Sequence, residues 1–81
     1  MPSKYVDRIV TLPDVMTGKP VIRGTRVPVE LIVRMVAQGI GAEEILSDYP
    51  RLTTQDIQAA LWYAADVVAE EDVFPLRLEP A

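Results

Sequence analysis

The sequence contains no cysteine and no histidine among its 81 residues. Without cysteine there is neither a disulfide nor a thiolate metal site, which fits a reducing cytosol. Without histidine the chain lacks the usual general base near neutral pH and the commonest metal ligand. No run approaches the roughly 18 apolar residues of a membrane span, and the N-terminus lacks the apolar segment of a signal peptide. We therefore expect a cytoplasmic protein that needs no cofactor.

Carboxylates are the remaining candidates for catalysis or metal binding. Glu43, Glu44 and Asp48 fall on one predicted helix, but acids in a first helical turn are ordinarily there because they favour the helix dipole. The acids near residues 66–72 are interpreted as a solvated face. No catalytic constellation is predicted, so we expect that the protein is not an enzyme, and a small-ligand enzyme is the weakest of the alternatives.

Length and composition indicate a single domain over residues 1–81, because 49% of the residues are apolar and 25% charged. The net charge of −4 is unevenly distributed. Residues 1–34 carry a net charge of +3, and residues 35–81 carry −7. A basic part joined to an acidic part suggests two kinds of partner or a contact between subunits, although chance in a small number of charges is the alternative.

The stretch Gly18–Pro28, GKPVIRGTRVP, combines two short β-branched runs with a tight turn. Gly24 and Thr25 separate the runs, and a two-residue loop with glycine first predicts a type II′ hairpin. Residues 8–12 form another predicted strand, which would pair with one arm of this hairpin. Residues 1–27 are therefore expected to form a small sheet that is stable only when helices pack against it.

A first helix is predicted over residues 28–38, with Gly39 in the C′ position that favours a left-handed φ. Most of its positions are apolar, which leaves a polar stripe only about 80° wide on the helical wheel. A helix this apolar is covered on several sides, so we expect it in the centre of the domain, at a subunit interface, or both. Leu31 and Met35 are its candidate interface residues.

Two further helices begin with the same local pattern of apolar residues at N′ and N4 around a capping residue. Gly41 caps the second helix, which should end near Tyr49 because a proline follows. Thr53 and Asp56 form the capping box of a longer third helix over residues 54–71.

The third helix carries two apolar rows. Its predicted core face comprises Ile57, Ala60, Leu61, Ala64, Val67 and Val68. A second row, on another face, comprises Gln58, Trp62, Ala65 and Ala69. A tryptophan in a row of small residues is typical of a surface that packs against another helix, although it can also cover the edge of its own core. The complete set of candidate partner or dimer-interface residues is Leu31, Met35, Trp62, Phe74, Leu76 and Leu78.

The predicted fold is mainly α with a small N-terminal β-hairpin or sheet. Residues 1–27 form the sheet, residues 28–71 three helices, and residues 72–81, with two prolines, an extended tail. The connection over residues 50–53 has the length of a helix-turn-helix turn. The pattern therefore predicts a three-helix helix-turn-helix domain of the homeodomain-like or winged-helix-like kind.

In such a domain the second helix of the motif enters the DNA major groove through its N-terminal residues. Here these are Thr54, Gln55 and Gln58, whose side chains can hydrogen-bond to phosphates or base edges. The third helix contains no Lys or Arg, so cations that neutralise phosphates have to come from elsewhere. The candidate DNA-binding cations are Lys19, Arg23, Arg26 and Arg51. A solvated hairpin surface is the alternative interpretation of the first three.

Three motifs occur in an order that is specific in combination: GKPVIRGTRVP at Gly18–Pro28, EILSDYP at Glu44–Pro50 followed by Leu52 and Thr53, and AALWYAA at Ala59–Ala65. With these motifs, residues 5–70 resemble the DUF433 family. The resemblance implies a small domain of the helix-turn-helix superfamily that is encoded beside a PIN-like ribonuclease. It also implies the antitoxin half of a type II toxin–antitoxin pair of the VapB kind.

The leading hypothesis from the sequence is thus a cytoplasmic, homodimeric antitoxin. It would neutralise a PIN-like toxin through its acidic helical half or its tail, and bind operator DNA weakly through the hairpin. The alternative is a scaffold module whose helices mediate protein–protein contacts without nucleic acid.

Overall fold

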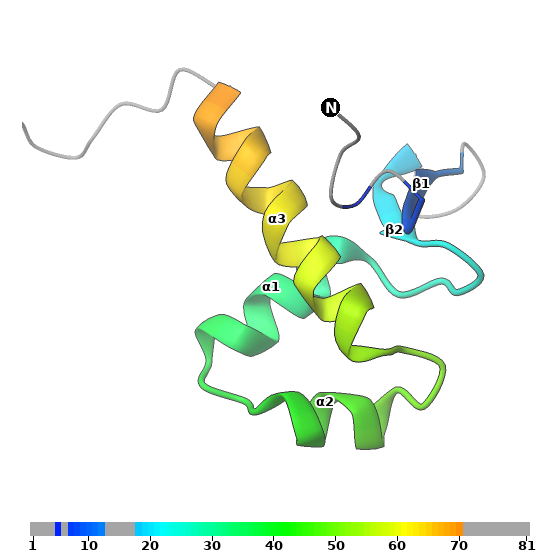
Figure 1. Ribbon diagram of the computed structural model, residues 1–81, viewed down its shortest axis with the longest axis vertical. Helices are drawn as coiled ribbons and strands as arrows, with labels where there is room; N and C mark the ends of the chain where they lie inside the picture. The colour runs from blue at the N-terminus through cyan, green and yellow to red at the C-terminus, as the bar shows by residue number, and fades with distance from the viewer. Residues whose placement is uncertain (1–4, 6, 13–17, 71–81) are drawn as a thin grey trace, which may run out of the picture.

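The computed structural model describes residue 5, residues 7–12 and residues 18–70. Two short strands precede three helices along the chain (Figure 1). The elements are β1 (Ile9–Thr11), β2 (Pro20–Ile22), α1 (Val29–Ala37), α2 (Ala42–Asp48) and α3 (Thr54–Glu70). The protein is therefore mainly helical with a small antiparallel sheet at its N-terminal end, as the sequence predicted. The predicted tail, including Phe74, Leu76 and Leu78, lies outside the described residues.

The sheet consists of β1 and β2, which pair antiparallel with Ile9 opposite Ile22 and Thr11 opposite Pro20. The Arg23 N–H extends the pairing by donating to the Arg8 carbonyl at 2.8 Å. Ile22 is 1% exposed and packs against the helices, which supplies the cover that a two-stranded sheet requires.

The turn after β2 differs from the predicted two-residue type II′ hairpin. Gly24 has the expected positive φ, 79°, but the Thr25 N–H donates to the Ile22 carbonyl at 3.0 Å. Gly24 therefore occupies the third turn position, where a type II turn requires positive φ. The Ile22 N–H bonds the Val27 carbonyl, so the loop holds four residues. The Thr25 hydroxyl stabilises this wider loop because it donates to the Ile22 carbonyl and accepts from the Val27 N–H.

Helix α1 ends as predicted at a glycine with positive φ, Gly39 at 84°. The Gly39 N–H donates to the Val36 carbonyl, and the Ile40 N–H donates to the Met35 carbonyl at 3.1 Å. This pair of bonds is the Schellman motif, which satisfies carbonyls at the helix end. At the other end the N-cap is Pro28, whose backbone is extended. The helix therefore begins at Val29, one residue later than predicted.

The starts of α2 and α3 confirm the predicted caps. Gly41 precedes α2 with extended backbone. At α3 the Thr53 N–H donates to the Asp56 carboxylate at 3.0 Å, and the Asp56 N–H donates to the Thr53 hydroxyl at 3.2 Å. Leu52 and Ile57, on either side of this capping box, are both buried. The reciprocal bonds and the apolar pair together fix where α3 begins.

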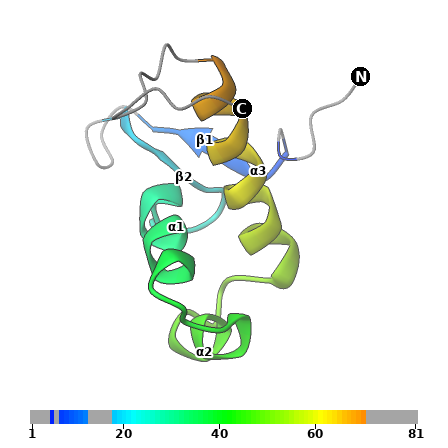
Figure 2. The same ribbon diagram turned by 90° about the vertical axis from the view of Figure 1, so that its left-hand side faces the viewer.

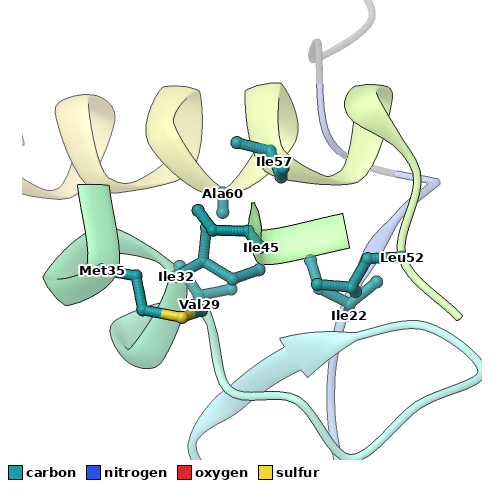
Figure 3. Packing of buried hydrophobic residues seen from close by; sticks show 8 residues of the cluster. All are labelled: Ile22, Val29, Ile32, Met35, Ile45, Leu52, Ile57 and Ala60. Carbon is teal, nitrogen blue, oxygen red and sulfur yellow. The ribbon is translucent and has the colours of Figure 1, made fainter. Parts of the chain in front are cut away.

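The core lies between the three helices and β2 (Figure 3). Its buried residues are Ile22, Val29, Ile32, Met35, Ile45, Leu52, Ile57 and Ala60. Met35 is only 8% exposed, so it is a core residue whose side chain serves the fold and is not available to a partner. Leu31, the other interface candidate on α1, is half-buried against the same core.

The predicted core face of α3 is partly wrong. Ile57 and Ala60 are buried, but Leu61 is 37% and Val68 60% exposed. Asp56 and Ala59 are buried instead, so the packing face is rotated around the helix. Asp56 binds Arg8 beside β1, so the first half of α3 contacts the N-terminal segment as well as α1. Among the described helices, none is long and apolar enough to cross a membrane.

Candidate nucleic-acid interface

A short turn joins α2 to α3 and presents polar side chains. The Leu52 N–H donates to the Tyr49 carbonyl at 2.9 Å, and the Leu52 side chain is 5% exposed. Leu52 therefore anchors the turn, while Arg51 beside it is exposed. Thr53, whose hydroxyl caps α3, is exposed as well, and it is followed by the exposed residues Thr54, Gln55 and Gln58 along the first turns of α3. One anchored turn thus displays a cation and three hydrogen-bonding side chains in sequence.

The loop after β2 contributes a second cation to this region. A surface hollow of about 810 Å³ separates this loop from the α2–α3 turn. Its lining residues are Leu12, Gly24, Thr25, Arg26, Val27, Asp48, Tyr49, Pro50 and Arg51. Figure 1 shows both segments on the same side of the molecule, to the right of α3. Two arginines that are distant in sequence, Arg26 and Arg51, thus border one hollow beside the start of α3.

One acidic residue reduces the positive charge of the hollow. Asp48, at the end of α2, lines the hollow with the two arginines. The remainder of the lining is largely apolar, with the Tyr49 ring and Pro50 among its walls. The hollow therefore offers two positive charges and an aromatic surface to a ligand that carries negative charge.

Lys19 does not line this hollow. Its Nζ lies 3.7 Å from the Glu30 carboxylate, which also lies 3.7 Å from the Arg34 guanidinium. All three side chains are more than half exposed, so the ion pairs add little to stability. Arg23 is exposed in the loop after β2, between Lys19 and Arg26 in the sequence. The predicted set of cations is thus divided, and only Arg26 and Arg51 share a surface.

An ion pair that the sequence did not reveal secures the start of α3. Arg8, next to β1, donates to Asp56 at 3.1 Å, and the Asp56 side chain is 9% exposed against 43% for Arg8. Asp56 was predicted as a capping residue alone. A cap uses one oxygen of the carboxylate, so the second oxygen is available to a distant cation, and the sequence contains no signal for which cation takes it.

A second surface of the molecule is apolar. Figure 2 shows α1 and α3 side by side above α2. Between α1 and the second half of α3 lies a groove of about 360 Å³, with Val33, Tyr63 and Val67 among its walls. Trp62, the interface candidate of α3, is 46% exposed. It belongs to the outer side of the helix rather than to this groove.

Metal binding finds no support in the described part of the chain. Within residues 5, 7–12 and 18–70, no three carboxylates gather closely enough to hold a metal ion. Glu43, Glu44 and Asp48 are exposed along α2.

The chain is similar in sequence and in structure to known proteins. Residues 9–64 match the model of a family described as protein of unknown function (DUF433). The uncharacterized protein y4eO of Sinorhizobium fredii is 41% identical over 56 residues, which cover 69% of this chain but 25% of that protein. The chain thus spans about a quarter of this relative's length. A crystal structure of a DUF433 member from Anabaena variabilis superposes with a TM-score of 0.72 and 32% identity, over 86% of this chain and 80% of the other.

Proposed function

Since the chain belongs to the DUF433 family, whose function is unknown, we propose a role from its surfaces: it binds operator DNA as a helix-turn-helix protein and serves as the antitoxin of a type II toxin–antitoxin pair. The observation that carries the DNA-binding part is the single hollow bordered by Arg26 and Arg51 beside the exposed first turn of α3.

The arrangement of α2 and α3 supports a helix-turn-helix interpretation. Residues 49–53 join the two helices, and this five-residue connection is one residue longer than the three- or four-residue turn of the motif. In such proteins the N-terminal residues of the second helix reach base edges in the major groove. The exposed side-chain amides of Gln55 and Gln58 can each donate and accept a hydrogen bond, which is the pattern that the major-groove edge of adenine requires.

The distribution of charge favours phosphate contacts by the loop after β2 and the α2–α3 turn. Helix α3 has no basic residue, and its first turn contains Asp56. Arg51 precedes α3 by three residues, and Arg26 lies across the hollow. Guanidinium groups bind phosphate oxygens with two parallel hydrogen bonds, which suits a pair of arginines that border one hollow.

A charge-matched pair of double variants tests this interface. Arg26→Ala with Arg51→Ala removes two cations at the hollow, and Lys19→Ala with Arg34→Ala removes two at the Glu30 cluster. The probe is the DNA upstream of the protein's own gene, and binding is measured by fluorescence anisotropy at several salt concentrations. The first variant should lower the slope of log K against log salt by about 2 for each chain bound, and the second should leave it unchanged.

Equal slopes for both double variants would remove the hollow from the DNA interface. If neither variant nor the native chain binds the DNA at low salt, the DNA-binding proposal fails altogether. If the protein nevertheless self-associates, the result would favour the alternative function, a module that mediates protein–protein contacts without nucleic acid.

The toxin partner is the second part of the proposal. Residues 35–81 carry a net charge of −7, and the three acids of α2 are exposed on the surface. An acidic helical surface is complementary to the basic groove with which a PIN-like ribonuclease holds RNA. Co-expression with the product of the adjacent gene should yield a complex that persists through gel filtration and suppresses RNA cleavage. Two proteins that elute separately, with cleavage intact, would contradict the antitoxin role.

A further inference from the structure

The hollow is formed where two sequence motifs, distant in the chain, come together. The motif GKPVIRGTRVP supplies residues 24–27 of the lining, and the motif EILSDYP supplies residues 48–50. Phosphate contacts give a role to Arg26 and Arg51. They give no role to the apolar part of the lining or to its one acid. The hollow therefore has features that DNA binding leaves unused.

The charged side chains around the hollow are not neutralised by one another. In the described part of the chain, the ion pairs are formed elsewhere, at Asp56 and at Glu30. Arg26, Arg51 and Asp48 border the same hollow but belong to no ion pair within the residues that the structure describes. Their charges are therefore available to different groups of a single ligand.

The position of Asp48 is unfavourable for its own helix. Asp48 is the last residue of α2, where the partial negative charge of the helix end disfavours a carboxylate. The last turn of α2 also contains no basic residue that would offset this effect. Helix stability thus gives no reason for an acid at this position. The exposed carboxylate can instead accept hydrogen bonds from a ligand in the hollow.

Hydrogen bonds hold both segments that border the hollow. The Thr25 hydroxyl closes the loop after β2 through its bonds to the Ile22 carbonyl and the Val27 N–H. In the α2–α3 turn, the Leu52 N–H donates to the Tyr49 carbonyl at 2.9 Å, and the Leu52 side chain is buried. A ligand that enters a site with walls already fixed loses less of its binding free energy to ordering the protein.

We propose that the hollow binds a guanine nucleotide, with the phosphate at Arg26 and Arg51 and the base on the apolar wall beside Asp48. Guanidinium groups donate paired hydrogen bonds to phosphate oxygens. A carboxylate only accepts hydrogen bonds, and guanine presents two neighbouring donors, its ring N–H and its amino group, on one edge. Tyr49 and Pro50 provide apolar surface for the planar base.

Size and polarity both favour a mononucleotide as the occupant. Sites for small ligands commonly have volumes of about 300–1,000 Å³, with mostly apolar walls and a few polar groups that orient the ligand. The hollow has this character, with a volume of about 810 Å³. Adenine has a ring acceptor beside its amino group, so the Asp48 carboxylate disfavours it. Inorganic phosphate matches the arginines but leaves the apolar wall exposed to water.

Nucleotide binding does not require that the chain binds DNA, so it is tested without DNA. Nuclear magnetic resonance titrations of the native chain measure the affinities for guanosine monophosphate (GMP), adenosine monophosphate (AMP), guanosine and inorganic phosphate. GMP should bind at least about tenfold more tightly than each of the other three, because each of these lacks one of the proposed contacts. The largest changes in chemical shift on addition of GMP should fall within residues 24–27 and 48–51.

The matched pair of double variants tests the phosphate contacts. Arg26→Ala with Arg51→Ala should weaken GMP binding at least about tenfold, because both proposed phosphate donors are lost. Lys19→Ala with Arg34→Ala also removes two cations, but outside the hollow, and should leave the affinity unchanged. If the chain also binds operator DNA through the same arginines, GMP should compete with that DNA, and this consequence alone depends on the proposed function.

Asp48→Ala tests the selection of the base. The variant should bind GMP more weakly and no longer distinguish it from AMP. Glu43→Ala removes the same charge from α2 at an exposed position outside the hollow, so it should keep the preference for GMP. Alanine is a good helix former, and circular dichroism should show both variants folded.

Four results would overturn the proposal. They are a native chain without saturable GMP binding, a native chain that binds AMP or inorganic phosphate as tightly as GMP, GMP binding that persists without the two arginines, and a preference for GMP that persists in Asp48→Ala.

Discussion

The two halves of α3 differ in what they contribute to the molecule. Residues 54–60 contain the four buried residues of the helix, Asp56, Ile57, Ala59 and Ala60. Residues 61–70, all of which the structure describes, contain none that is buried. The first half is fixed by the capping box, by Arg8 and by the core, whereas the second half contacts the rest of the domain through half-buried or exposed side chains.

This difference separates stability from recognition within one helix. A domain of this size buries little apolar surface, so each buried side chain contributes a large share of its free energy of unfolding. The second half leaves the apolar side chains of Leu61 and Val68 exposed, so it contributes less to that free energy. We therefore expect substitutions in the first half of α3 to lower the free energy of unfolding more than substitutions in the second half.

The largest expected effect is that of Ile57→Ala. Ile57 is 6% exposed in the core, so truncation leaves a cavity and should reduce the free energy of unfolding by about 3 kcal/mol. Leu61→Ala, one turn later at 37% exposure, should cost less than about 1 kcal/mol. Urea unfolding followed by circular dichroism, at a concentration where the chain is monomeric, measures both. Similar losses for the two variants would contradict the division of α3.

A smaller effect is expected for Asp56→Ala. The substitution removes the cap of α3 and leaves the Thr53 N–H without its acceptor, which should cost about 2 kcal/mol. Arg8→Ala should cost less than about 1 kcal/mol, because Arg8 is 43% exposed and water replaces part of its interaction. A double-mutant cycle separates the two contributions. If Arg8→Ala cost as much as Asp56→Ala, the ion pair rather than the cap would secure the helix.

The parts of the fold that were predicted correctly from the sequence are those set by interactions between residues close together in the chain. Gly39, Gly41 and the pair Thr53 and Asp56 define helix ends through bonds within a few residues, and all of these ends were predicted correctly. The turn at Gly24 was misassigned because the Thr25 side chain, not the backbone pattern, sets the loop length. Side-chain bonds of this kind compete with regular turns and are hard to recognise in a sequence.

Features that depend on tertiary contacts were predicted less well. The packing face of α3 includes Asp56, whose partner Arg8 is 48 positions away in the sequence. Leu61 and Val68 have the spacing of a core face, but both are exposed because α3 packs through Asp56, Ile57, Ala59 and Ala60 instead. Three of the candidate DNA-binding cations, Lys19, Arg23 and Arg26, belong to one motif, but ion pairing with Glu30 associates Lys19 with a different surface from that of Arg26.

The smallest expected effect is that of Asp66→Ala. Each half of α3 has one aspartate that a residue before β2 binds, so the two aspartates allow a direct comparison of the two halves. Asp66 accepts from the Tyr5 hydroxyl at 2.9 Å, but this bond is exposed, whereas that of Asp56 is partly buried. Water can replace an exposed acceptor, so the free energy of unfolding should change by less than about 0.5 kcal/mol. Urea unfolding of Asp56→Ala and Asp66→Ala under identical conditions measures the contrast. Equal losses would mean that the second half of α3 is held as firmly as the first. A loss confined to Asp56→Ala would support a helix whose stability resides in its first half.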